Sequence, residues 1–177
     1  MHKERDNLWL LVTGLMVAGM MTFTGCDDDE REEPAPRDIV DVISLTPNLS
    51  TLASAIEVGK LNFTLRDTGP YTILAPSNDA FENLPDGLLR ALLNNPEKLS
   101  DLVLYHTLAG SISSTNFTTG SAAPFYKRDG HIEIEVDGPS IILNGSSSVI
   151  GPDNEGVNGV VHVISEVLFP AEFEFPN

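Results

Sequence analysis

The run Gly159-Val160-Val161-His162-Val163-Ile164 constrains the fold more than any other part of the sequence. Successive side chains of a β-strand point to opposite faces. Apart from His162 this run is apolar on both faces, so it predicts a central strand that is buried on both sides. A histidine in the middle of such a strand is expected to be hydrogen-bonded within the core.

Helical signals come mainly before this strand. Helices are predicted over residues 38–43, 50–59, 78–84 and 88–93, and a further helix is predicted to start at Asn95. Asp38 and Asn95 favour the N-cap position, and the proline that follows Asn95 fits the first helical position. In segment 50–59, Ser50 or Thr51 is expected to cap the start, and Gly59 is expected to end the helix.

Short strands are predicted over 71–74 and after residue 110. In His131–Val136, apolar and charged residues alternate, which places the two glutamates on the solvent side. Asn144-Gly145 is typical of a two-residue hairpin turn, and Asp153–Gly156 is expected to be a polar hairpin loop rather than a calcium site. Helices followed by strands indicate the α+β class.

Composition argues against several classes of protein. The 177 residues leave room for one ordinary domain and a short appendage. A formal net charge of −16 and a pI near 4.3 argue against nucleic acid as a partner and favour a monomeric domain. One cysteine and four histidines offer few ligands for zinc, so neither a metal site nor a cofactor is expected.

Residues 1–25 have the pattern of an export signal. Residues 8–25 carry no charge and follow a lysine and an arginine, an order typical of secretory signals. An uncleaved transmembrane helix is the alternative. Residues 23–26, Phe-Thr-Gly-Cys, resemble the lipobox of bacterial lipoproteins, although Leu is more usual in the place of Phe23. The resemblance implies cleavage before Cys26, a diacylglycerol with acyl chains such as palmitate on its sulfur, and attachment to the outer membrane.

An acidic segment follows this cysteine. Residues 26–37 include Asp27, Asp28, Asp29 and Glu30 and lack large apolar side chains, so they are expected to form a disordered tether. The acids also resemble the surface-export signal of lipoproteins in some Gram-negative bacteria, which implies a position facing out from the cell. Calcium binding is disfavoured because a flexible run lacks the fixed loop geometry of calcium sites.

Two blocks of sequence, residues 69–81 and 158–170, resemble the signature blocks of the fasciclin domain family. The positions that carry the resemblance include Thr72, Ala75, Pro76, Asn78, Phe81, Asn158, Gly159 and His162. Leu74 and Ser165 depart from the pattern. The resemblance implies an α+β fasciclin-type fold, a compact sandwich of short β-strands flanked by several α-helices. It covers residues 38–171, which leaves 172–177 as a C-terminal tail.

Tyr105 and His106 are the candidate binding residues. They resemble a Tyr-His segment that is linked to receptor adhesion in animal members of the family. The alternative is structural: Tyr105 closes a helix against the core, and His106 satisfies buried polar groups near the first signature block. The structural interpretation is preferred because both residues directly follow a buried stripe of apolar side chains.

No catalytic residue is predicted, because the sequence lacks a nucleophile elbow, a phosphate loop and a dinucleotide fingerprint. The leading hypothesis is a lipid-anchored adhesion or binding module at the cell surface, not an enzyme. Its ligand would be a matrix protein, another cell surface or a polysaccharide. One alternative is a structural envelope or biofilm-matrix component that acts by weak self-association. A glycan-active enzyme that uses a carboxylate pair is less favoured.

Overall fold

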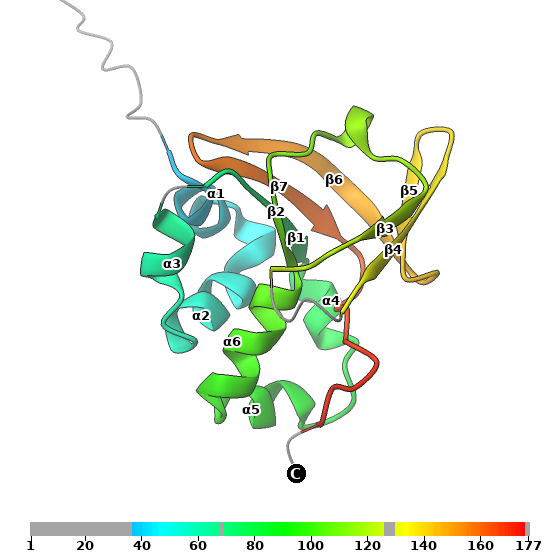
Figure 1. Ribbon diagram of the computed structural model, residues 1–177. Helices are drawn as coiled ribbons and strands as arrows, with labels where there is room; N and C mark the ends of the chain where they lie inside the picture. Colours follow the sequence, from blue (N-terminus) through cyan, green and yellow to red (C-terminus); the bar gives the residue numbers. More distant parts are fainter. Residues whose placement is uncertain (1–36, 68, 126–129, 176–177) are drawn as a thin grey trace, which may run out of the picture. The chain divides into compact units, whose positions relative to one another are not determined.

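A computed structural model describes residues 37–67, 69–125 and 130–175 of the chain (Figure 1). The helices of these residues are α1 (Ile39–Leu45), α2 (Ser50–Val58), α3 (Asn62–Arg66), α4 (Asn78–Glu82), α5 (Leu88–Leu93) and α6 (Pro96–Tyr105), with short 3₁₀ helices at Pro47–Leu49 and Ser114–Asn116. The strands are β1 (Tyr71–Pro76), β2 (Thr107–Ala109), β3 (Gly120–Ala122), β4 (Ile132–Asp137), β5 (Ser140–Leu143), β6 (Ser147–Gly156) and β7 (Gly159–Ile164).

The seven strands are joined in the order β2-β1-β7-β6-β5-β4-β3. β1 and β7 are parallel, and every other neighbouring pair is antiparallel. The long strand β6 links the two halves of the sheet, because its first residues pair with β5 and the rest pair with β7. Register shifts between Val149 and Asn154 interrupt the β6–β7 ladder, as β-bulges do. The α+β class is therefore confirmed.

The central pair β1–β7 has two faces that are covered differently. On the helix side, Ile73, Ala75, Val161 and Val163 pack against apolar residues of the helices. Figure 1 shows these helices gathered on one side of β1 and β7. All six residues of β7 are buried, so the prediction of a central strand covered on both sides is confirmed.

The opposite face, here called the sheet side, carries Thr72, Leu74, His162 and Ile164. Leu74 and Ile164 join a second apolar cluster with Leu108 of the neighbouring strand β2 and with residues of the other half of the sheet and of the segment between β2 and β3, namely Phe117, Ile132, Ile134, Ile141 and Leu143. The two halves of the sheet therefore enclose a shared core, which gives the strands their sandwich character.

Most predicted helix signals are confirmed. The Asp38 side chain accepts a hydrogen bond from the Asp41 amide at the start of α1, and the Asn95 side chain accepts one from the Lys98 amide at the start of α6. Gly59 follows the last residue of α2. The start of α2 was predicted wrongly: Ser50 is its first helical residue, and neither Ser50 nor Thr51 caps it.

Two predicted turns differ from the structure. Asn144 and Gly145 both have positive φ, as a type I′ turn requires. However, Leu143 pairs with Ser147, so the loop between β5 and β6 has three residues rather than the two that were predicted. Asp153–Gly156 lies inside β6 rather than in a hairpin loop. The reason is that the preceding register shifts let β6 continue as far as Gly156 before the chain turns.

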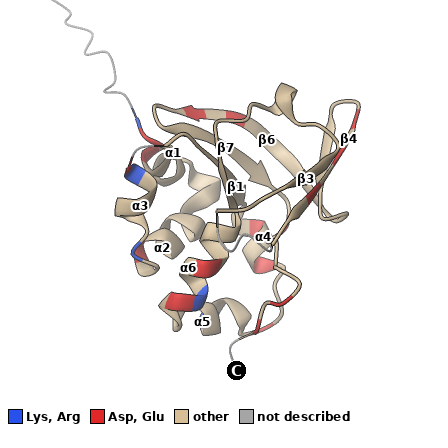
Figure 2. Cartoon of the chain, in the orientation of Figure 1, with Lys and Arg blue, Asp and Glu red and all other residues tan. Residues whose placement is uncertain are grey.

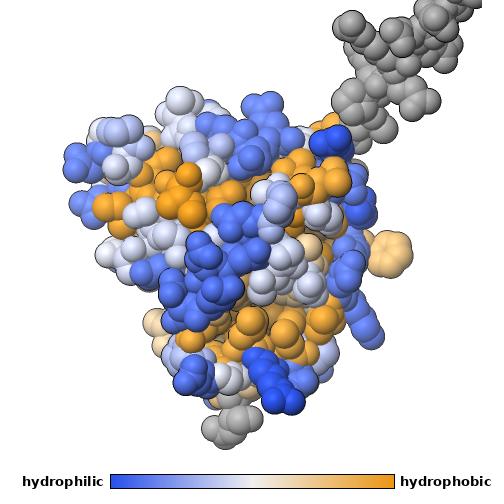
Figure 3. Space-filling view, turned by 180° about the vertical axis from the view of Figure 1, so that it is seen from behind, coloured by the Kyte–Doolittle hydropathy of each residue, from blue (hydrophilic) through white to orange (hydrophobic). Residues whose placement is uncertain are grey.

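The surface of the domain is mostly polar. Acidic residues are scattered over helices and strands, whereas the fewer basic residues lie mainly on the helices and at the start of α1 (Figure 2). Seen from the back, hydrophobic areas alternate with hydrophilic ones (Figure 3). Within the described ranges no single helix is long and apolar enough to span a membrane; α1 and residues 47–58 reach that length and composition only together, across a bend of 104°.

Candidate binding site

Asn78, from the first signature block, connects helices that are distant in sequence. Its Oδ1 accepts a hydrogen bond of 3.0 Å from the Thr51 amide in the first turn of α2. Its Nδ2 donates one of 3.0 Å to the carbonyl of Pro47. Asn78 therefore supplies the cap that the local sequence of α2 lacks, since the first amides of a helix have no partner within it.

Asn158, from the second signature block, has the same kind of role. Its Oδ1 accepts a hydrogen bond of 2.9 Å from the Ile39 amide at the start of α1, and its Nδ2 donates one of 2.8 Å to the carbonyl of Leu65 in α3. The neighbouring Gly159 lies directly against β1, where a Cβ atom would come within 2.1 Å of the Tyr71 carbonyl oxygen. These signature residues hold the helices onto the end of the β6–β7 hairpin.

The remaining residues of the first block are also part of the interior. Ala75 and Phe81 are buried in the helix-side cluster, and Pro76 ends β1. The Thr72 hydroxyl donates a hydrogen bond of 2.7 Å to the carbonyl of Gly110 and accepts one of 2.9 Å from the Ile112 amide. The signature therefore describes the scaffold of the domain.

His162 is fully buried and uses both ring nitrogens. Its Nδ1 lies 3.1 Å from the Asp153 amide, which donates to it, and its Nε2 lies 2.8 Å from the carbonyl of Ile112. These partners require the tautomer with the proton on Nε2. The expectation of a hydrogen-bonded core histidine is confirmed.

His106 is also buried, at the end of α6. Its Nδ1 lies 2.8 Å from the carbonyl of Leu102, and its Nε2 accepts a hydrogen bond of 2.9 Å from the Leu168 amide. The His106 carbonyl also accepts a hydrogen bond of 2.9 Å from the Leu74 amide of the first signature block, and the ring lines a small cavity with Pro76 and Phe81 of that block. The structural interpretation, in which His106 satisfies buried polar groups near the first block, is confirmed. Burial lowers the pKa of His106 from 6.5 to about 4, against the opposing effect of its bond to Leu102. His106 is therefore neutral at pH 7 and has no free ring nitrogen for a ligand.

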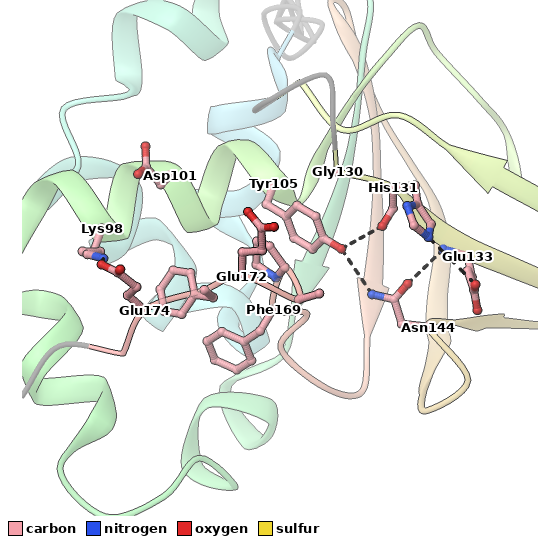
Figure 4. Close-up of a pocket in the computed structure, with 13 residues that line it drawn as sticks. Lys98, Asp101, Tyr105, Gly130, His131, Glu133, Asn144, Phe169, Glu172 and Glu174 are labelled. Carbon is pink, nitrogen blue, oxygen red and sulfur yellow. Dashed lines mark hydrogen bonds and ion pairs between the residues drawn. The ribbon is translucent and has the colours of Figure 1, made fainter.

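Tyr105 is the last residue of α6, and only 3% of its surface is exposed. Its hydroxyl donates a hydrogen bond of 3.0 Å to the carbonyl of His131, and the Nδ2 of Asn144 approaches it at 3.4 Å. Asn144 in turn accepts a hydrogen bond of 2.9 Å from the Glu133 amide. This network fixes the start of β4 and the β5–β6 turn against the end of α6 (Figure 4).

This network forms one end of an open groove of about 830 Å³. The other lining side chains come from α6 and from the segment after β7, and they include Lys98, Asp101, Phe169, Glu172, Phe173 and Glu174. Figure 4 shows Lys98 and Glu174 at the opposite end from Asn144 and Glu133, with Phe169 and Glu172 between them. The volume lies in the range of ordinary ligand sites, so this groove is the candidate binding site.

One part of the groove is aromatic and its rim is mainly acidic. The rings of Phe169, Phe173 and Phe175 lie 5.2–5.4 Å apart, centroid to centroid. Lys98 forms an ion pair of 3.1 Å with Glu174 and lies over the Phe173 ring. A surface with apolar rings in the middle and charged side chains at the margin can bind a partner through packing and through electrostatic contacts.

Sequence reasoning placed only Tyr105 and the neighbouring His106 near this site. It missed Phe169 and Phe173, although Phe169, Phe173 and Phe175 recur at short intervals in the sequence and signal a packed segment. Residues 172–177 were predicted to be a tail, yet Phe173 packs against the helix-side cluster. Cys26, Asp27, Asp28, Asp29 and Glu30 lie outside the described residues. The described residues contain no group of three or more His, Cys, Asp or Glu side chains that is arranged to hold a metal ion.

The fasciclin domain model matches residues 47–170. The chain belongs to the fasciclin domain family, and the resemblance of the two signature blocks is confirmed. Protein sll1483 of Synechocystis is 33% identical over 141 residues, which cover 75% of this chain and 73% of that protein.

Longer relatives match in part. The pig transforming growth factor-beta-induced protein ig-h3 is 33% identical over 132 residues, which cover 75% of this chain and 19% of the relative. Human periostin is 35% identical over 133 residues, which cover 75% of this chain and 16% of periostin. The chain therefore spans less than a fifth of these two relatives.

A solved structure confirms the fold. A fasciclin domain pair from the insect cell adhesion molecule fasciclin I superposes with a TM-score of 0.64 at 15% identity. The match covers 75% of this chain and 51% of the solved chain. At this identity the likeness concerns the fold alone.

Proposed function

We propose that this protein is an adhesion or binding module that a lipid on Cys26 holds at the outer face of the cell. The observation that carries the proposal is the fasciclin domain itself, which occupies residues 47–170. The solved structure of the same fold comes from a cell adhesion molecule. The histidine and asparagine side chains discussed above form hydrogen bonds with backbone groups of the domain. A ligand would therefore be recognised by other side chains, on the surface.

The groove is the surface that we assign to the ligand. It combines aromatic area with a rim of charges and is accessible from solvent, as a contact site for a protein or polysaccharide requires. Tyr105 and His106 would act by shaping one end of it rather than by contacting the ligand with free polar groups. Glu133, which lines the groove, would be a direct contact.

The location is tested in cells that express the full chain. Cys26→Ala is expected to remove the acyl anchor and release the protein from the membrane fraction. Replacing Asp27, Asp28 and Asp29 with Ala is expected to abolish labelling of the protein in intact cells. A Cys26→Ala protein that stays membrane-integral would contradict the anchor, and unchanged labelling of the triple variant would contradict the export role of the acids.

Binding is tested with the same cells on arrays of immobilised matrix proteins and polysaccharides. Glu133→Lys is expected to weaken adhesion, because it reverses a charge in the groove. Glu135→Lys is the matched control, since it makes the same change on the same face of β4 but does not line the groove. Equal effects of both variants would assign binding to overall charge, and cells with and without the protein that adhere equally would refute the adhesion role.

A further inference from the structure

Phe63 is exposed to an unusual degree for an aromatic side chain. It lies in α3 with 90% of its surface accessible. Leu61 and Leu65, two residues to either side, are buried, so Phe63 points away from the core on the opposite side of the helix. The exposure is therefore built into the amphipathic pattern of α3.

Phe63 lies beside the point where the N-terminal part of the chain joins the domain. Arg66, three residues further on, lies on the same face of α3. Its guanidinium forms ion pairs of 2.5 Å with Asp38 and 2.8 Å with Asp41, at the start of α1. The hydrogen bond from Arg66 to Asp41 lowers the pKa of Asp41, so this pair is charged over the whole neutral range.

A second exposed apolar side chain lies at the same place. Val157, in the turn between β6 and β7, is 67% exposed, and its amide donates a hydrogen bond of 2.9 Å to the carbonyl of Arg37. The next residue, Asn158, bonds to Ile39 in α1 and to Leu65 in α3. Val157 thus lies next to Arg37, and Asn158 ties its turn to α3, the helix that carries Phe63.

We call the surface formed by Arg37, Phe63, Arg66 and Val157 the entry corner. Figure 2 shows basic residues at the start of α1 and on α3, in a domain with many acidic ones. Figure 3 shows a hydrophobic side chain that stands clear of the surface on the side of α1 and α3. Exposed apolar side chains suit a phospholipid interface, where they reach the acyl boundary while charged groups stay in the headgroup layer. The ion pairs of Arg66 with Asp38 and Asp41 would lie in that polar layer.

We propose that the entry corner rests on the phospholipid bilayer, with Phe63 and Val157 in its interfacial layer. The proposal rests on the lipid anchor at Cys26 proposed above. Residues 27–37 span at most about 40 Å even when fully extended, so the anchor keeps the corner within that distance of the headgroups. Because the anchor makes this contact intramolecular, a small apolar surface suffices to populate it. The groove, which shares no lining residue with the entry corner, then remains available to other ligands.

The test uses tryptophan fluorescence. Trp9, the chain's single tryptophan, precedes Cys26, so the cleaved chain contains none. The full chain with Phe63→Trp is expressed, extracted with its lipid and reconstituted into phosphatidylcholine vesicles. Its emission is expected to shift to the blue on reconstitution and to be quenched by phosphatidylcholine brominated in the acyl chains. The wild-type chain, treated identically, measures any signal from uncleaved Trp9.

Ile150→Trp is the matched control. Ile150 is 55% exposed and lies in β6, seven residues before Val157 in the turn that follows this strand, which places it about 20 Å away along the strand. Its emission is expected to stay unshifted and unquenched on the same vesicles. Val157→Trp is expected to behave like Phe63→Trp.

The outcomes separate the contact from the anchor. If the lipidated chain stays on the vesicles but Phe63→Trp is neither shifted nor quenched, the contact is refuted and the anchor stands. If Phe63→Trp and Ile150→Trp are quenched equally, the contact is not specific to the corner and the proposal is refuted. A blue shift without vesicles that grows with protein concentration would identify a second copy of the chain as the occupant instead. A chain that leaves the vesicles like the Cys26→Ala variant refutes anchor and contact together.

Discussion

The helix side and the sheet side of the β1–β7 pair are held by different kinds of contact. On the helix side, Ile73 and Val161 meet apolar side chains of the helices. On the sheet side, the strands carry Thr72 and His162, which bond to backbone groups of another segment. Both sides are equally buried, so burial alone does not explain the difference.

The backbone of the covering element explains it. A helix satisfies its own amides and carbonyls, so apolar packing is enough to hold it against a sheet. The sheet side is crossed instead by residues 110–117, here called the covering loop, whose Gly110 and Ile112 have carbonyls and amides that need partners. A loop packs against a sheet only if the polar backbone groups that it turns toward the core are bonded. The hydroxyl of Thr72 and the ring of His162 provide these bonds from within the strands.

The largest expected effect comes from the helix side. Ile73→Ala removes a fully buried side chain and leaves a cavity, so the free energy of unfolding is expected to fall by about 2–5 kcal/mol. Ile73→Val is the control and is expected to cost only about 0.5–1.5 kcal/mol. Urea denaturation followed by circular dichroism measures both. A small effect of Ile73→Ala would mean that the helices close over the gap and that packing on this side is loose.

A pH titration probes His106, the buried histidine among the helices. Because its pKa falls from 6.5 in the unfolded chain to about 4 in the domain, the unfolded state binds the proton first as pH decreases. The contribution of neutral, buried His106 to the free energy of unfolding is fully present above pH 6.5. It is lost progressively as the pH falls to 4, by about 3 kcal/mol in all. Unfolding free energies measured from pH 7 to pH 5 check this slope.

The control for this titration is His106→Gln, which has no titrating group. Its stability is expected to vary less than that of the wild type between pH 7 and pH 5. The acids with lowered pKa, Asp41 and Asp153, titrate below this window and leave the comparison unaffected. Equal slopes for variant and wild type would show that another group controls the pH dependence.

On the sheet side, Thr72→Val tests the bonds to the covering loop. The change keeps the shape of the side chain but leaves the Gly110 carbonyl and the Ile112 amide without their partner. The expected loss is about 1–3 kcal/mol, the cost of unsatisfied buried groups. Thr72→Ser keeps the hydroxyl and is expected to lose less. If the valine variant were as stable as the wild type, the bonds to the loop would contribute nothing.

The sequence predicts the elements whose signals are local. The two-sided strand Gly159–Ile164 and the start of α6 at Asn95 need only their own residues, and both are confirmed. The cap of α2 could not be found locally, because Asn78 supplies it from a distant position in the chain. Sequence reasoning also missed α3, although the spacing of Leu61 and Leu65 by four residues is a helical signal.

The candidate site was less predictable than the fold. Tyr105 was identified from its resemblance to the Tyr-His segment of the family, but the groove also needs Asn144 from a hairpin and Phe169 from the segment after β7. These residues come from distant parts of the chain, and β6, which joins the two halves of the sheet, has register shifts in its ladder with β7. Bulges of this kind carry weak sequence signals, which explains why Asp153–Gly156 was predicted to be a loop.

The smallest expected effect is a coupling energy that compares the two sides directly. Phe117, in the covering loop, packs its ring edge-on against the ring of His162 at 5.2 Å. Phe117→Leu is expected to cost about 1 kcal/mol, because it removes this ring contact and some apolar area. Since Thr72 holds the same loop, Phe117→Leu and Thr72→Val are expected to be non-additive, with a coupling of about 0.5 kcal/mol or more.

The matched cycle combines Phe117→Leu with Ile73→Val, which lies next to Thr72 in β1 but faces the helices. These two changes are expected to add, because their side chains share no partner across the sheet. Urea denaturation of the two double-mutant cycles measures both coupling energies. Coupling of equal size in the two cycles would mean that β1 transmits strain between its faces. Coupling confined to the Thr72 cycle would mean that the covering loop is a unit held by polar bonds, separate from the packed helices.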